Sequence, residues 1–171
     1  MSTQKNNFVY RLASLSDKEQ LKDLALISYG QFYNLLTPEN SKALSDSLNN
    51  DDKLIELITI STCYVCLDED VIIGMAHIIP NRNPSDIFKT EWSYIRMVGV
   101  NPTYQGQGIA KSLTKMCIDK AKQTKEKTIA LHTSEFMDAA RHIYESLGFK
   151  VLHEIAPRLG KKYWLYTLDL S

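Results

Sequence analysis

The segment from Met97 to Ala110 limits most strongly what this chain can fold into. A strand-like run ends before Pro102, a turn with Gly106 and Gly108 follows, and an amphipathic helical pattern starts at once. The first backbone N–H groups of a helix have no partner within the helix and lie at the positive end of its dipole. Glycines let an anion approach those groups without a Cβ in the way. The segment therefore predicts a strand, a turn and a helix that together bind a phosphate or a pyrophosphate.

Two common phosphate-binding motifs do not fit this turn. A Walker loop ends in Gly-Lys-Ser/Thr, whereas Gly108 is followed by Ile109 and Ala110. A dinucleotide-binding turn needs a third glycine where Lys111 stands, and an acidic residue about 20 residues further on. From the turn alone, Gly106 and Gly108 could also simply shape a tight connection before a helix, and that alternative stays open.

The rest of the chain alternates between strand-like and helix-like patterns. Runs rich in β-branched and apolar residues, bounded by turn residues, predict strands at 8–13, 62–67, 71–79, 92–100, 128–132, 149–155 and 163–170. Capping signals at Ser16 and Thr37, the turn at Gly108 and the pattern from Met137 predict helices after them, with a short helix at 54–58. This order predicts an α/β (α+β) domain with a mixed sheet that is antiparallel through its hairpins.

Length and charge narrow the class of protein. The chain has 171 residues, which suits one domain over residues 1–171. Its 20 basic and 20 acidic residues cancel, so no overall field favours nucleic acid or an anionic membrane as a partner. No run approaches the roughly 18 apolar residues of a membrane span, and the first seven residues lack the apolar core of a secretory signal. We expect a cytoplasmic protein.

The cysteines suggest packing rather than a metal site. Cys63 and Cys66 lie three residues apart in a predicted strand, so their side chains face opposite sides of the sheet. They could not share a zinc ion or form a disulfide with each other, and no second cysteine pair exists. We expect no metal.

Two motifs together resemble one known family. Gln105-x-x-Gly108-x-Ala110, preceded by Val100-Asn-Pro, resembles the Gln/Arg-x-x-Gly-x-Gly/Ala signature of the GCN5-related N-acetyltransferase (GNAT) superfamily. Ala140-x-x-x-Tyr144-x-x-x-Gly-Phe149 is similar to that family's second block, and the order of elements resembles it over nearly the whole chain. The resemblance implies a mostly antiparallel sheet of about seven strands flanked by helices, with the fourth and fifth strands splayed apart around acetyl-CoA.

The resemblance also implies which residues contact acetyl-CoA. The backbone of the fourth strand would bind the pantetheine arm as an added strand does. The glycine turn would hold the pyrophosphate. Gly99, a glycine within a β-branched strand, independently suggests a bulge or a close backbone approach there. The implied contacts are Met97, Val98, Gly99, Val100, Gln105, Gly106, Gln107, Gly108, Ile109, Ala110, Lys111 and Ala140.

For catalysis, the resemblance implies direct acetyl transfer to a primary amine in a ternary complex. The Tyr144 hydroxyl would protonate the departing sulfur, although Tyr144 could also be only a packing residue on one face of its helix. Tyr94 stands where some members have a glutamate base, which leaves Glu91, His132 or a water chain as the route for the amine's proton. The alternative is a non-catalytic module of the same fold that binds acyl-CoA as a sensor.

The acceptor is not identified by these motifs. A small molecule or a peptide amine fits equally, and the chain could act as a monomer or a homodimer. Tyr29, Phe32 and Tyr33 could line an acceptor pocket or belong to the core.

Overall fold

One mixed sheet organises the computed structural model, which describes residues 7–171. Its strands, in spatial order, are β1 (Val9–Leu12), β2 (Thr62–Asp68), β3 (Val71–Ile79), β4 (Ser93–Val100), β5 (Thr128–Ser134), β7 (Lys161–Asp169) and β6 (Lys150–Arg158). Neighbours pair antiparallel except β4 and β5, which are parallel. The predicted fold class is confirmed. Most of the amino-terminal stretch assessed for a secretory signal, residues 1–6, lies outside the described residues.

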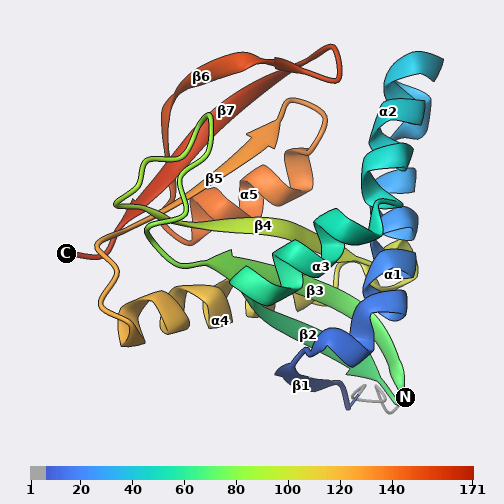
Figure 1. Cartoon of the computed structure of the whole chain (residues 1–171), viewed down its shortest axis with the longest axis horizontal. Coiled ribbons are helices and arrows are strands. Elements are labelled where there is room, and N and C mark those ends of the chain that lie inside the picture. Colours follow the sequence, from blue (N-terminus) through green and yellow to red (C-terminus); the bar gives the residue numbers. More distant parts are fainter. Residues whose placement is uncertain (1–6) are drawn as a thin grey trace, which may run out of the picture.

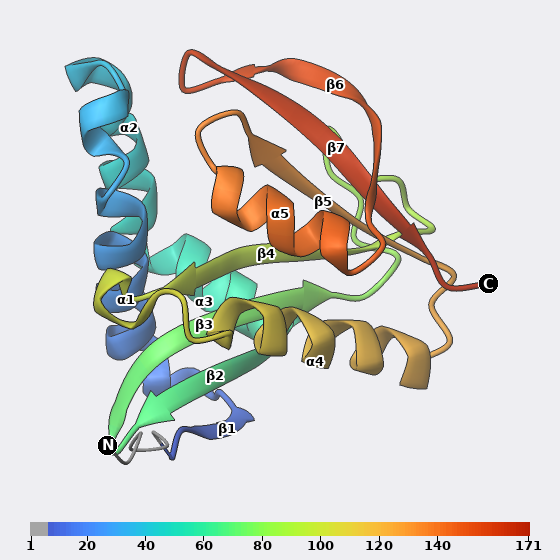
Figure 2. The same ribbon diagram turned by 180° about the vertical axis from the view of Figure 1, so that it is seen from behind.

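Helices cover both faces of this sheet (Figures 1 and 2). α1 (Lys18–Gly30) and α3 (Asp51–Ile60) lie over one face, with α2 (Pro38–Leu48) packed against α1. α4 (Ile109–Gln123) and α5 (Asp138–Ser146) lie on the opposite face. Each face has its own apolar core, because strand side chains alternate between the two sides. Leu21, Leu24 and Met75 are buried on the α1 side, and Ile95, Leu113 and Tyr166 on the α4 side. No helix in residues 7–171 is long and apolar enough to cross a membrane.

Several local predictions are confirmed residue by residue. The buried residues of α1 are Leu21, Leu24, Ala25 and Ser28, which stand at the i, i+3, i+4 and i+7 spacing that predicts the buried face of a helix from sequence. The Thr37 side chain caps α2 by accepting a hydrogen bond from the Asn40 backbone N–H at 3.1 Å. Cys63 and Cys66 do face opposite cores. Periodicity and capping chemistry are local properties, and for this reason they can be read from sequence.

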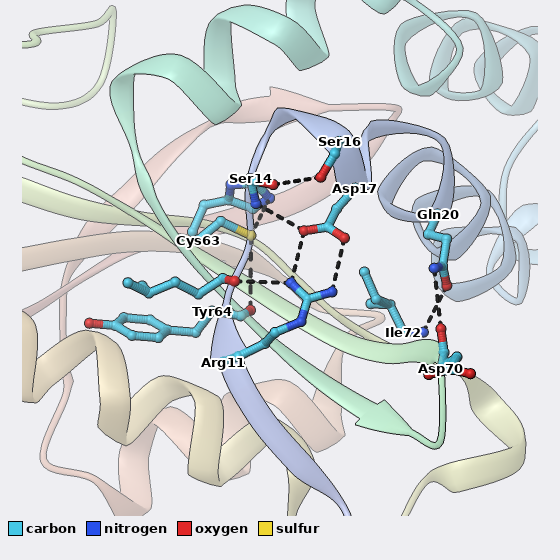
Figure 3. Close-up of polar contacts among 11 residues, drawn as sticks. Arg11, Ser14, Ser16, Asp17, Gln20, Cys63, Tyr64, Asp70 and Ile72 are labelled. Atoms are coloured by element: carbon cyan, nitrogen blue, oxygen red, sulfur yellow. Dashed lines mark hydrogen bonds and ion pairs between the residues drawn. The ribbon is translucent and has the colours of Figure 1, made fainter.

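The start of α1 differs from the prediction. A short 3-10 turn (Leu15–Asp17) precedes the helix, and the carboxylate of Asp17 accepts a hydrogen bond from the Ser14 backbone N–H at 2.9 Å. The sequence predicts the cap at Ser16, which stands three residues before Glu19 as in a capping box, and this prediction is therefore wrong by two residues. The cause is Arg11 on β1, whose guanidinium binds both Asp17 oxygens at 2.9 and 3.0 Å and fixes the carboxylate at this end of the helix (Figure 3).

A second polar contact fixes α1 to the β2–β3 hairpin. The side-chain amide of Gln20 accepts from the Ile72 backbone N–H at 2.9 Å and donates to the Asp70 carbonyl at 3.3 Å (Figure 3). With its first turn tied to β1 and to this hairpin, α1 runs across β3 and β4. Its carboxyl-terminal end thereby reaches the part of β4 where the site forms.

Candidate functional site

The sheet opens between β4 and β5. Only two residue pairs join these strands, Ser93 with Ile129 and Tyr94 with Ala130. β4 nevertheless continues to Val100 and β5 to Ser134, so beyond Tyr94 the two facing strand edges have no strand between them among the described residues. Figure 1 shows β5, together with the β6–β7 hairpin, swinging away from β4. Backbone N–H and C=O groups at such an edge need a partner, and an extended ligand can supply it.

A bulge marks β4 within this opening. Met75 pairs with Gly99 and His77 with Arg96, so that Met97 and Val98 together stand opposite Ala76 alone. Met97 has a φ of 56°, in the left-handed region. The extra residue of a bulge is left out of the ladder, which turns its backbone groups toward the open side. A backbone N–H can therefore be aimed into the opening at Met97 or Val98.

Gly99 has a different role from the bulge itself. A Cβ at Gly99 would come within 3.0 Å of the Ser28 Oγ on α1 and 3.2 Å of the Met75 Cε. Gly99 therefore permits the close approach of α1 to β4. The sequence suggested either such an approach or a bulge at Gly99, and the bulge lies two residues earlier, at Met97.

The turn that follows β4 has the open geometry expected of an anion site. Gly106 and Gly108 have φ values of 80° and 78°, and a Cβ at either would meet no atom within 4 Å. Gly108 is the N-cap of α4, and the next backbone N–H groups lie in the first turn of a helix, where no carbonyl of the helix reaches them. Ile109 is buried in the core and holds this turn in place, while Ala110 and Lys111 are partly exposed.

The end of α1 contacts this turn directly. The Gln105 side chain donates a hydrogen bond from Nε2 to the Gln31 Oε1 at 3.1 Å, and the Gln31 Nε2 donates to the Ser28 carbonyl at 2.6 Å. These contacts join the C-terminus of α1 to the residue that begins the glycine turn. The open edge of β4, the bulge and the turn follow one another along the chain between Ile95 and Gly108.

Tyr144 lies deep on the α5 side of this site. Its ring is 7% exposed and packs edge-on against Phe149 at 6.0 Å between centroids. Burial raises the pKa of the hydroxyl, with further contributions from Tyr29 and Cys117. Tyr29 belongs to α1 on the opposite face of the sheet, so this electrostatic contribution acts between the two faces. The raised pKa keeps the Tyr144 hydroxyl protonated near neutral pH and makes it a weaker acid than an exposed tyrosine.

His132 and Tyr94 lie on the other side of the opening, the side that α1 and α3 cover. The Nδ1 atom of His132 is buried without a hydrogen-bond partner among the described residues. Burial lowers the pKa of His132 to about 3, assisted by the positive charges of Arg96 and Arg158. The Tyr94 hydroxyl donates to the Asn83 carbonyl at 2.9 Å, and its ring stacks on Phe88 at 4.1 Å. Both groups can accept a hydrogen bond from water or from an amine.

Aromatic rings connect these residues across the opening. Phe32 at the end of α1 contacts Phe136 (5.1 Å between centroids), which contacts Tyr163 on β7 (6.3 Å). Tyr163 contacts His132 (5.7 Å), which contacts Phe88 (5.9 Å) and so reaches Tyr94. Phe32, one of the three aromatic residues that could have been core or pocket, thus forms part of a ring-lined wall on this side.

The structure does not bring every candidate residue to the opening. Glu91 is exposed in the turn before β4, at the end where β4 and β5 are still paired. Ala140 packs against the core on the α4 side, together with Val98 and Val100 from β4. Of Glu91 and His132, the two residues considered for the amine's proton, the fold places only His132 beside the opening, on the same face as Tyr94.

One functional residue escaped the sequence analysis. Arg96 lies on β4 immediately before the bulge, and its side chain is exposed although β4 is a central strand. Its charge acts on Tyr29, Tyr94 and His132. The signal in the sequence was a single arginine within the otherwise uncharged run from Trp92 to Val100.

The described residues contain no group of three or more His, Cys, Asp or Glu side chains that could hold a metal ion. Cys63, Cys66 and Cys117 are buried, and burial raises the pKa of each thiol, to about 12 for Cys63. A thiol with a raised pKa is a weak nucleophile at neutral pH. Backbone N–H groups of β4, tyrosine hydroxyls, the neutral imidazole of His132 and the guanidinium of Arg96 lie around the opening.

Comparison with known proteins finds one matching family model and several similar proteins. The model of the acetyltransferase (GNAT) family matches residues 29–149. N-alpha-acetyltransferase 30 of Schizosaccharomyces pombe is 34% identical over 86 residues, and its Saccharomyces cerevisiae counterpart is 43% identical over 56 residues. The Schizosaccharomyces pombe match covers 50% of this chain and 55% of that protein, and the Saccharomyces cerevisiae match covers 33% of this chain and 32% of that protein. This chain therefore spans less than two thirds of the length of either relative.

A solved structure matches over nearly the full length. The PaiA N-acetyltransferase from Thermoplasma acidophilum, in complex with coenzyme A, superposes with a TM-score of 0.77 at 15% identity. The match covers 95% of this chain and 99% of that protein. At this identity the likeness concerns the fold.

Proposed function

Since the chain belongs to the acetyltransferase (GNAT) family, we propose that it transfers the acetyl group of acetyl-CoA directly to a primary amine. The observation that carries this proposal is one continuous site: the unpaired edge of β4 leads past the Met97 bulge to a glycine turn with open space at both glycines. An extended arm that ends in a pyrophosphate matches this arrangement in shape and charge. The curated relatives named above are N-alpha-acetyltransferases, which agrees with an amine as the acceptor.

The residues present fit coenzyme A. The backbone of β4 from Met97 to Val100 would bind the pantetheine arm, and the turn from Gln105 to Lys111 would bind the pyrophosphate with its backbone N–H groups. A Cβ at Gly106 or Gly108 would occupy the space through which phosphate oxygens approach. When bound, acetyl-CoA supplies a thioester whose carbonyl carbon the amine attacks.

The chain's own groups would then act on three atoms. A backbone N–H at the bulge stabilises the negative charge that develops on the carbonyl oxygen. The Tyr144 hydroxyl donates its proton to the departing sulfur. On the opposite side of the opening, His132 and Tyr94 accept hydrogen bonds from the incoming amine or from a water bound to it.

His132 would not act as a strong base. An imidazole with a pKa of about 3 cannot hold a proton taken from an ammonium group of pKa about 10.4. We therefore infer that the amine reacts from its neutral form. The proton leaves through water, with His132 and Tyr94 orienting the amine. No covalent acetyl-enzyme is needed, in keeping with the buried, weakly nucleophilic thiols.

Initial-rate measurements test this proposal. Release of free thiol is followed over a grid of acetyl-CoA and amine concentrations. Direct transfer predicts lines that intersect in a double-reciprocal plot, since both substrates must be bound together. Parallel lines would instead indicate a covalent acetyl-enzyme. Binding of acetyl-CoA without thiol release for any amine would contradict an enzyme and identify a sensor of the same fold.

A further inference from the structure

Arg96 lies over a cavity that the helices of one face leave open. The cavity has a volume of about 380 Å³ and is lined from below by Tyr94, Arg96 and Met97 of β4. Residues of α1 and α3, among them Ala25, Leu54 and Leu57, form its opposite wall. The gap explains how a side chain in the middle of a central strand is exposed to solvent. The volume lies within the range of about 300–1,000 Å³ that is typical of small-molecule sites.

This cavity carries an excess of positive charge. Its charged lining residues are Lys22, Lys53 and Arg96 against the single carboxylate of Glu56. Lys22 forms an ion pair with Asp51, but Arg96 has no carboxylate partner among residues 7–171. Arg11, Arg141 and Arg158 are paired with aspartates, whereas Arg82, exposed in the loop before β4, has no carboxylate partner among the described residues either. An unpaired guanidinium in a cavity is a site for an anion that comes from outside the protein.

The anion in question is not the pyrophosphate of coenzyme A. Arg96 precedes the bulge and therefore shares a face of β4 with Tyr94, while Ile95 points into the core under α4. The glycine turn begins α4, on the other face. Arg96 instead stands among the groups that would meet the amine, since its charge acts on Tyr29, Tyr94 and His132.

We propose that the acceptor is a primary amine that also carries a carboxylate, and that Arg96 binds this carboxylate through its guanidinium. The inference rests on the proposed function and narrows its acceptor. A polyamine or another purely cationic acceptor would bring further positive charge to Arg96 and Lys53, which like-charge repulsion disfavours. An amine with a carboxylate cancels the charge of Arg96 and is oriented by a two-pronged contact.

Matched pairs of acceptors test the proposal. Leucine is compared with 3-methylbutylamine, and phenylalanine with 2-phenylethylamine, because each pair differs only in the carboxylate. A tetrapeptide amide that begins with aspartate is compared with the same peptide beginning with asparagine, which separates a side-chain carboxylate from that of a free amino acid. We expect the carboxylate-bearing member of at least one pair to have a kcat/KM at least about 10-fold higher, the lower end of the effect of a charge-assisted hydrogen bond, because the guanidinium of Arg96 is exposed to solvent.

Variants of Arg96 assign that preference to its side chain. Arg96→Met should lower the kcat/KM of the carboxylate-bearing member of a pair far more than that of the carboxylate-free member, mainly through KM, and so remove most of the preference. Arg96→Lys keeps the charge without the planar fork and should recover part of it. Lys115→Met, an exposed position on α4 across the sheet, removes one positive charge elsewhere and should leave the preference intact.

Equilibrium binding separates this inference from the proposed function. Calorimetry with the protein saturated with coenzyme A measures how tightly leucine and 3-methylbutylamine bind without any turnover. If neither turnover nor binding prefers any carboxylate-bearing probe, the assignment of Arg96 is overturned, although acetyl transfer can stand. The assignment is likewise overturned if Arg96→Met weakens both members of a pair equally. If the preference appears in binding while no amine is acetylated, the role of Arg96 holds and the proposed function fails.

Discussion

Tyr94 and Ala130 form the last residue pair that joins β4 to β5, and the candidate site begins where this pair ends. On the side of this pair where β4 begins, β4 and β5 are paired and the sheet is continuous. Beyond the pair, the edge of β4 is available to an extended ligand, and Tyr29 of α1 and Tyr144 of α5, which lie on opposite faces of the sheet, interact electrostatically. The opening therefore connects a surface suited to coenzyme A with a separate surface suited to an amine.

The glycine turn provides the first prediction. Gly108→Val places a branched side chain at a φ of 78° and fills the space before α4, so we expect coenzyme A binding to weaken by about 2–4 kcal/mol, the loss of a charge-assisted network. Calorimetry measures the affinity of the variant and of the wild type for coenzyme A. Gly160→Val is the matched control, because Gly160 also has a left-handed φ, 71°, but lies in the β6–β7 turn. A folded Gly108→Val protein with unchanged affinity would exclude phosphate binding at this turn.

Tyr144 provides the second prediction. Tyr144→Phe keeps the ring and its contact with Phe149 but removes the proton donor. We expect kcat to fall about 100-fold, a typical share for general acid catalysis. Coenzyme A affinity and the melting temperature should change little. Wild-type turnover in this variant would make Tyr144 a packing residue only.

The route of the amine's proton provides the third prediction. Since Glu91 is exposed at the closed end of the β4–β5 pair, Glu91→Gln should leave kcat/KM within about twofold of the wild type. His132→Gln should lower it by about 10-fold or less, because water can replace part of a hydrogen-bonded relay. Measurements of kcat/KM with one amine across pH 6–9, for the wild type and both variants, check these two expectations. A loss of three or more decades in either variant, with coenzyme A binding intact, would identify that residue as a dedicated base.

Acid stability provides the fourth prediction. Burial lowers the pKa values of His77 and His132 to about 3, below the ordinary value of 6.5. Below pH 6.5 the unfolded chain therefore binds protons that the folded chain does not, so stability is lost as the pH falls from 6.5 toward 3. Each histidine should lower the free energy of unfolding by about 1 kcal/mol between pH 6 and pH 5.

Urea unfolding of two variants checks this assignment. His132→Gln should remove one histidine's share of the pH dependence. His153→Gln, at an exposed position on β6, is the control for replacing a histidine that the fold does not bury. Equal pH dependence in His132→Gln and the wild type would show that His132 is not held neutral by the fold.

Much of the fold could be predicted because its signals are local. The buried face of α1, the cap at Thr37 and the hairpin of β2 and β3 each follow from spacing or capping within a few residues. The start of α1 was misplaced because Ser14 and Ser16 both stand three residues before an acidic side chain. The choice between them depends on Arg11, which is on another element.

The site was only partly predictable, because some of its features depend on how distant elements pack together. The glycine turn and Tyr144 belong to short motifs, whereas the exposure of Arg96 depends on how α1 and α3 pack over β4. The bulge at Met97 has no glycine to mark it, and Gly99 marks instead the approach of α1. Whether Glu91 or His132 lies beside the opening is decided by where β4 and β5 part, which no local pattern encodes.

The most direct test of the account follows the acetyl group itself. The protein is mixed with acetyl-CoA carrying carbon-13 in the acetyl group and with a saturating amine, and mass spectrometry quantifies labelled amide, free coenzyme A and labelled protein. Direct transfer predicts one labelled amide for each coenzyme A released and no label on the protein. Coenzyme A release without labelled amide, or an acetyl group retained on the protein, would contradict it.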